Sequence, residues 1–158
     1  MFDKYLSRNR GSIDAYDKML ADCGNWFPSE LKILWTEFDA SYVIDNFIDL
    51  QNIDDILSHV IQLSEVISWC QENPDQSLQK IPIFESERGA TVFLYRDLGK
   101  DPCGYFYVHT HSSKLAVKMG DNLNAVFSSL NSKPISLPEG AKVLSVWSDP
   151  NFDFSDYE

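Results

Sequence analysis

Two histidines spaced two residues apart, His109 and His111, are the pair of side chains in this sequence best placed to bind a metal ion. In an extended strand such residues point to the same face, so both imidazoles could reach one ion. A third ligand is needed, and residues 112–116 contain no carboxylate. Glu85 and Glu87 could complete a site only if the fold brought them close. We interpret the histidines as ordinary residues at a hairpin end, and expect neither a metal nor another cofactor.

The other reactive residue types form no catalytic set. The sequence has no Gly-x-Ser-x-Gly nucleophile elbow and no Gly-rich phosphate loop. Carboxylate pairs such as Glu85 and Glu87 are too common in so acidic a chain to indicate a glycosidase. The three cysteines, Cys23, Cys70 and Cys103, include no C-x-x-C pair, which is typical of free thiols in a reducing compartment. The sequence therefore predicts a protein that is not an enzyme.

The strongest signal is electrostatic. Between Lys32 and Lys80 the chain runs for 47 residues without a Lys or Arg. The same segment carries nine carboxylates: Glu37, Asp39, Asp45, Asp49, Asp54, Asp55, Glu65, Glu72 and Asp75. Such a block is either a solvated face or a surface that attracts cationic partners. With 13 basic residues against 24 acidic ones, the chain lacks the cations for binding nucleic acid or an anionic membrane.

The length of 158 residues fits one domain that can bury about 70% of its unfolded surface. The first twenty residues lack the apolar core of a secretory signal, and no later stretch approaches 18 apolar residues. We expect a cytoplasmic protein with a single domain over residues 1–148. Residues 149–158 form an acidic, aromatic tail.

Two helices are predicted near the N-terminus. Ser12 is a good N-cap for a helix over Ala15–Leu20, and Gly24 is placed to end it. Ser29 can cap a second helix, in which large apolar residues recur at helical spacing. These residues, which should be buried, are Leu31, Leu34, Trp35 and Phe38.

The acidic block itself contains a further helical pattern. Tyr42–Leu50 is short and rich in β-branched and aromatic residues, which favours a strand or an irregular connector. From Asn52 onward, apolar residues recur every three or four positions, with Asp54 and Asp55 in what would be a first helical turn. The sequence predicts one long acidic helix here, ending at Asn73 before a proline.

Strand patterns follow Lys80. Ile81–Phe84 is a short apolar segment that precedes the strands. Ala90–Arg96 and Gly104–His111 are predicted to pair as antiparallel strands. Alternation places Val92 and Leu94 on one face of the sheet and Phe93 and Tyr95 on the other.

A last helix is expected close to the C-terminus. Asp121 or Asn122 can cap it, and its apolar residues are Leu123, Val126, Phe127 and Leu130. The order of elements predicts an α+β fold, with N-terminal helices packed on a small antiparallel sheet and a further helix near the C-terminus.

Several of these pieces, in this order, match one known family over about Ser12–Leu130. They are the N-terminal helix leading into WFPSEL at 26–31, the acidic helix, IPI at 81–83, the two aromatic-rich strands and LNAVFSSL at 123–130. This order resembles the SUKH superfamily, the family of the yeast Smi/Knr cell-wall-synthesis regulator and of many bacterial immunity proteins. The chain differs where a Gly-rich turn is expected after the second helix, because it has Asp39-Ala40-Ser41 there.

The resemblance implies a non-enzymatic domain that neutralises a bacterial toxin by direct contact. A nuclease toxin holds phosphates with Lys and Arg, which the carboxylates of an inhibitor could engage. We therefore expect an immunity protein whose partner is a basic nuclease, without nucleic-acid or membrane partners. It should be a monomer or a weak dimer, since like charges oppose self-association. The alternative is a regulatory scaffold of the Smi/Knr type that is not linked to a toxin.

The residues predicted to contact the toxin are acidic: Asp45, Asp49, Asp54, Asp55, Glu72, Asp153 and Asp156. Asp54 and Asp55 have a competing explanation as stabilisers of a helix N-terminus. The tail residues alternate with aromatic side chains, as at an interface, but a terminus is also commonly frayed. For the scaffold alternative, Tyr95, Tyr105 and Tyr107 are the candidates for an exposed aromatic face of the sheet.

Overall fold

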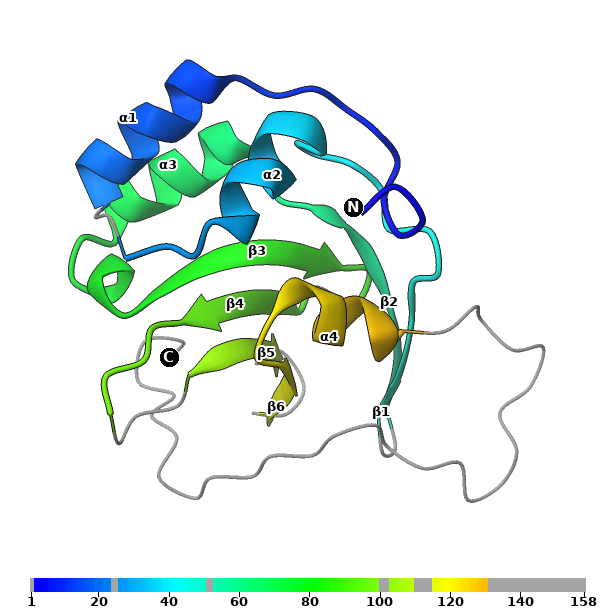
Figure 1. Ribbon diagram of the computed structural model, residues 1–158. Coiled ribbons are helices and arrows are strands. Elements are labelled where there is room, and N and C mark those ends of the chain that lie inside the picture. The colour runs from blue at the N-terminus through cyan, green and yellow to red at the C-terminus, as the bar shows by residue number, and fades with distance from the viewer. Residues whose placement is uncertain (1, 24–25, 51–52, 100–102, 110–114, 131–158) are drawn as a thin grey trace.

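The computed structural model describes residues 2–23, 26–50, 53–99, 103–109 and 115–130 (Figure 1). These residues form an α+β fold, as the sequence predicted. A six-stranded antiparallel sheet has its strands in chain order, so each strand pairs with the next one along the sequence. The strands are β1 (Phe47–Leu50), β2 (Ile53–Val60), β3 (Lys80–Ser86), β4 (Thr91–Tyr95), β5 (Gly104–His109) and β6 (Leu115–Gly120).

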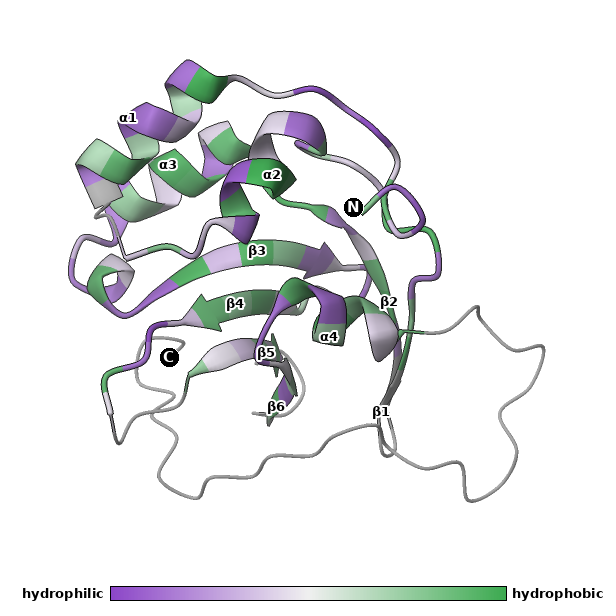
Figure 2. Ribbon diagram, viewed as in Figure 1, coloured by the Kyte–Doolittle hydropathy of each residue, from purple (hydrophilic) through white to green (hydrophobic). Residues whose placement is uncertain are grey.

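Four helices complete the described part of the chain. They are α1 (Ile13–Cys23), α2 (Glu30–Glu37), α3 (Leu63–Glu72) and α4 (Leu123–Ser128), with a short 3-10 turn at Gln76–Leu78. Helices α1, α2 and α3 lie together over the sheet in Figure 1. Hydrophobic and hydrophilic residues share each of these helices in Figure 2, as expected of helices with one buried and one solvent-facing side.

The main core lies between these helices and the sheet. Leu31, Leu34 and Trp35 of α2 are fully buried there, and the Trp35 indole donates a hydrogen bond of 3.1 Å to the carbonyl of Ile61. Val92 and Leu94 face this core, whereas Phe93 and Tyr95 belong to a second cluster on the other face. The predicted alternation along β4 is therefore confirmed.

The long acidic helix predicted from Asn52 is wrong. Residues 53–60 form β2, and α3 begins only at Leu63. Leu57 and Val60 are both fully buried in the core although they are three residues apart, because the register with β3 shifts between Leu57 and His59. A bulge of this kind adds one residue to the strand and so imitates helical spacing.

Helix starts were predicted with mixed success. Ser12 and Asn122 cap α1 and α4, because their side chains accept hydrogen bonds from Ala15 N and Ala125 N. The Ser29 side chain makes no such bond at α2. Strand β6 was not predicted.

Helix α3 is capped by a residue far away in sequence. Oδ1 of Asp39 accepts a hydrogen bond of 2.8 Å from Leu63 N. The next residue, Ala40, has a φ of 55°, in the left-handed region that favours glycine. This position lies in the Asp39-Ala40-Ser41 segment, where the resemblance led us to expect a Gly-rich turn.

Candidate interaction surface

The fold divides the acidic block between two places. Asp45 is exposed just before β1, and Asp49 stands directly opposite Asp54 in the β1–β2 pair. Glu72 is exposed at the end of α3, away from that hairpin (Figure 1). The structure therefore places Asp49 and Asp54 on one hairpin, with Asp45 just before it, and separates Glu72 from all three. The tail residues Asp153 and Asp156 lie outside the described residues.

Asp55 is not a surface residue. Its side chain is 3% exposed, and Oδ2 accepts a hydrogen bond of 2.7 Å from the Tyr107 hydroxyl. Oδ1 accepts from the backbone nitrogens of Ile56 and Arg88. Because these bonds hold the carboxylate inside the domain, we leave Asp55 out of the surface proposed below.

Glu30, like Asp55, accepts hydrogen bonds from groups that are far away in sequence. Its Oε2 accepts a hydrogen bond of 2.6 Å from the Tyr105 hydroxyl and one of 3.0 Å from Leu123 N, so α2, β5 and α4 meet at this carboxylate. Burial raises the pKa of Tyr105, and the nearby carboxylate of Glu30 adds to this effect. Burial also raises the pKa of Tyr107, together with its hydrogen bond to Asp55.

The expectation of an exposed aromatic sheet face is wrong. Tyr95, Tyr105 and Tyr107 are all buried. The exposed aromatic residue is instead Tyr42, whose side chain is 71% exposed, and Ile44 two positions later is 52% exposed. The described residues include five exposed large hydrophobics, of which Tyr42 and Ile44 are the two closest in sequence: Ile13, Tyr42, Ile44, Leu78 and Leu98.

Backbone hydrogen bonds fix the segment that carries Tyr42 and Ile44. The Tyr42 carbonyl accepts a bond from Ser7 N, and Ile44 N donates to the carbonyl of Tyr5. On the other side, Val43 N donates to the carbonyl of Ser58. Val43 is buried between these partners, so the residues on either side of it point to solvent.

We call the group formed by Tyr42, Ile44 and Asp45 the Tyr42 surface. It combines two exposed apolar side chains with an exposed carboxylate from the segment that lacks Lys and Arg. Sequence reasoning found the carboxylate but missed the two apolar residues. Their alternation around Val43 was the available signal, although a sequence does not say which side of an alternating segment faces solvent.

Two of the three basic residues in the N-terminal segment, Lys4 and Arg8, contact other groups of the domain, and the third is the exposed Arg10. Arg8 pairs with Asp3 at 2.7 Å and lies 3.6 Å from a carboxylate oxygen of Glu37. The Lys4 ammonium lies 4.9 Å from the ring centre of Tyr5. The ion pairs of Arg8 offset part of the positive charge that this segment presents.

A second acidic area lies on the helical layer. Three exposed carboxylates of α1 and two of α3 lie on helices that pack side by side, with Lys18 as the one cation on these two helices (Figure 1). They are Asp14, Asp17, Asp22, Glu65 and Glu72. No exposed pair of large apolar residues accompanies them among the described residues, so this area resembles a solvated face.

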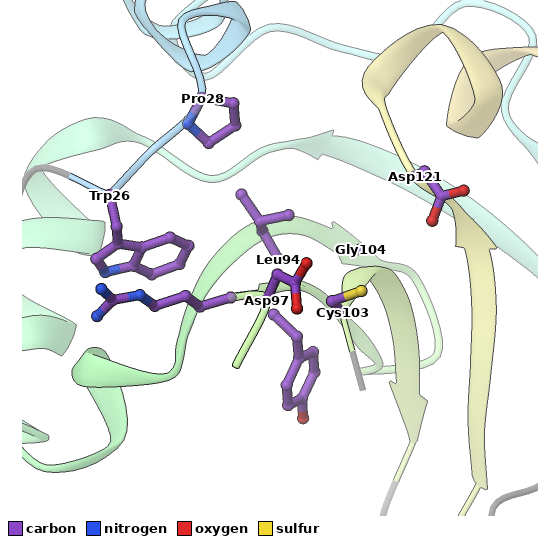
Figure 3. Close-up of a pocket in the computed structure, with 9 residues that line it drawn as sticks. Trp26, Pro28, Leu94, Asp97, Cys103, Gly104 and Asp121 are labelled. Atoms are coloured by element: carbon purple, nitrogen blue, oxygen red, sulfur yellow. The ribbon is translucent and has the colours of Figure 1, made fainter. Parts of the chain in front are cut away.

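A pocket of about 400 Å³ opens at one end of the sheet (Figure 3). Trp26 and Pro28 come from the segment before α2, whereas Cys103 lies just before β5 and Asp121 just before α4. The remaining lining residues are Leu94, Tyr95, Arg96, Asp97 and Gly104. The Arg96 guanidinium lies 5.8 Å from the Trp26 ring centre, and the described residues that line the pocket include no histidine to serve as a base for Cys103.

No protein-family model matches the chain, and searches of curated proteins and of solved structures returned no match. Within the described ranges, His, Cys, Asp and Glu side chains form no group of three that could hold a metal ion. His109 is buried at the end of β5, and His111 lies outside the described residues. The described helices are all too short or too polar to cross a membrane.

Proposed function

We propose that this domain is an immunity protein that neutralises a cognate bacterial toxin by direct binding through the Tyr42 surface. The observation that carries the proposal is the exposed pair Tyr42 and Ile44 beside Asp45. Large apolar side chains that stay in water cost free energy in the isolated domain, and an aromatic anchor beside charged groups is typical of binding surfaces.

The chemistry of the surface favours a basic partner. The exposed carboxylate of Asp45 can accept charge-assisted hydrogen bonds from Lys or Arg side chains. A nuclease presents such cations where it holds the phosphates of its substrate, so carboxylates of an inhibitor can occupy the same positions. The net charge of −11 would speed the encounter with a cationic toxin at low salt.

The geometry suits tight binding because the apolar anchors sit on fixed backbone. Tyr42 and Ile44 are held between the N-terminal segment and β2 by hydrogen bonds of 2.8 to 3.1 Å. A surface that is already ordered loses less conformational entropy on binding. The resemblance of the sequence to the SUKH superfamily supports an immunity role over other kinds of binding domain.

The test is co-expression with the open reading frame immediately upstream of this gene. Rescue of cells from toxicity, together with co-purification of both products, is the expected result. A toxic product that this protein neither binds nor neutralises would contradict the proposal. If the neighbouring product is neither toxic nor bound, the alternative of a Smi/Knr-type scaffold becomes the better explanation.

A further inference from the structure

One row of paired residues crosses the sheet on the face opposite the main core. It begins with the bridge between Tyr42 and His59. The strand register continues it from His59 to Glu85 on β3 and from Glu85 to Thr91 on β4. Residues paired in this way share a face of the sheet. Val60, which follows His59 in β2, lies in the main core on the other face.

The row is exposed at the end where Tyr42 lies. Tyr42 is 71% exposed, and the side chains of His59 and Glu85 are 32% and 47% exposed. Beyond Thr91 the row reaches Val108 on β5, which is only 3% exposed. The row therefore changes from accessible polar side chains next to Tyr42 to a buried apolar one on β5.

His59 holds the carboxylate of Glu85 in place. Nε2 of the imidazole lies 3.4 Å from Oε2 of Glu85, and Nδ1 lies 3.0 Å from the hydroxyl oxygen of Ser58. Contacts at both ring nitrogens give the imidazole a defined orientation. A histidine offsets the charge of a carboxylate only while it is protonated. Glu85 can therefore still accept hydrogen bonds from a permanently charged cation.

The backbone fixes the spacing between Tyr42 and Glu85. Val43 N donates a hydrogen bond of 3.1 Å to the carbonyl of Ser58, which ties the Tyr42 segment to β2. Strand β3 pairs with β2 on its other side. Neighbouring strands are about 4.8 Å apart, so the backbones at Tyr42 and Glu85 are roughly 10 Å apart, with His59 between them.

The charge around the row favours a cationic ligand. Asp45 is exposed three positions after Tyr42. The chain has no Lys or Arg between Lys32 and Lys80, and this stretch includes the Tyr42 segment and all of β2. The fold thus brings Glu85, which lies outside the acidic block of the sequence, next to that block.

We propose that Tyr42, His59 and Glu85 form a docking site for one arginine side chain of a basic partner, which we call the arginine site. The guanidinium donates two parallel hydrogen bonds to Glu85, and the aliphatic stem lies across His59 against the Tyr42 ring. Arginine suits this site better than lysine, because its planar head pairs with a carboxylate while its face packs on a ring. This inference deepens the proposed function and rests on it only for the identity of the partner.

The test is an NMR titration of the isotope-labelled full-length chain with acetyl-tetraarginine amide. The matching tetracitrulline peptide is the uncharged control. Amide resonances of His59, Glu85 and Thr91 should shift with the arginine peptide and not with the citrulline peptide. Glu85→Gln should weaken peptide binding about fivefold. Glu65→Gln removes the same charge from an exposed position on α3, and it should leave the affinity unchanged.

Two outcomes would overturn the inference. One is a set of shifts that is absent from β2 and β3 or gathers instead on α1 and α3. The other is equal weakening by Glu85→Gln and Glu65→Gln, which would be a general effect of net charge. If the upstream toxin still binds in either case, the proposed function stands and only the arginine site is refuted. If the peptide binds at Glu85 but the upstream toxin does not bind, the arginine site stands and the proposed function fails.

Discussion

The Tyr107 hydroxyl donates a hydrogen bond of 2.7 Å to Oδ2 of Asp55, and so joins β5 to β2 across the two strands between them. Both side chains are buried. Hydrogen bonds to a charged group are worth more than neutral ones, and the loss of one partner leaves the buried carboxylate with fewer bonds. The stability of the fold should therefore be sensitive to substitution of either residue of this pair.

We expect Tyr107→Phe to lower the free energy of unfolding by about 2–3 kcal/mol, because Oδ2 of a buried Asp55 loses its hydroxyl donor. Tyr105→Phe is the matched control, since Glu30 is only half-buried and water can replace the lost donor. It should cost roughly 1 kcal/mol. Urea denaturation of both variants measures the difference, and equal losses would show that burial of the carboxylate does not matter.

Stability should fall in alkaline solution because of the same two tyrosines. Their pKa values are raised above the ordinary 10.0, so the folded protein keeps protons that the unfolded chain releases. The stabilisation is fully present below pH 10 and declines as the pH rises further. The double variant Tyr105→Phe, Tyr107→Phe should show a weaker decline between about pH 10 and 12. Parallel curves for wild type and variant would refute this.

Asp39 should matter for α3 through its hydrogen bond to Leu63 N. We expect Asp39→Ala to lower the free energy of unfolding by about 1 kcal/mol, whereas Asp39→Asn keeps an acceptor and should cost less. Burial raises the pKa of Asp39, so its charged form is disfavoured and its contribution to stability decreases as the pH rises through the folded pKa. Relative to Asp39→Asn, the wild type should therefore be more stable at pH 3 than at pH 7. Thermal unfolding at both values is the measurement.

Ala40 has a φ of 55°, which is costly for a residue with a Cβ. We expect Ala40→Gly to raise the free energy of unfolding by roughly 0.5–1 kcal/mol, and Ala40→Val to lower it. Chemical denaturation of the three proteins gives the order. A glycine variant less stable than wild type would mean that the entropy of the unfolded chain outweighs the relief of strain.

For the Tyr42 surface, we expect Tyr42→Ala to weaken toxin binding about thirtyfold, equivalent to roughly 2 kcal/mol. Asp45→Lys should mainly slow association and should do so less at high salt. Leu78→Ala is the control, because Leu78 is similarly exposed but is not part of the Tyr42 surface. Calorimetry and surface kinetics would measure these effects, and equal affinities of all three variants would place the contact elsewhere.

Elements with a regular pattern were predictable from the sequence. The two faces of β4 follow from strict alternation, and the caps at Ser12 and Asn122 depend on neighbours three residues away. Strand β2 was not predictable in the same way. Its bulge shifts the pattern by one residue, and the pairing that decides between strand and helix comes from β1 and β3.

The site was only partly predictable for the same reason. The acidic block was visible in the sequence, but the burial of Asp55 depends on Tyr107, which is 52 residues away. The exposure of Tyr42 depends on which neighbours enclose Val43. Long-range contacts of this kind leave no periodic signal in the chain.

The bridge at Glu30 also has a consequence for the order of events during synthesis. Strands in chain order can pair with their predecessors as they leave the ribosome, but the partners of Glu30 arrive 75 and 93 residues later, at Tyr105 and Leu123. Helix α2 is therefore made long before the groups that fix its first turn exist. A nascent chain released before α4 would carry α2 without this link, and such chains should be the ones that cellular proteases remove first.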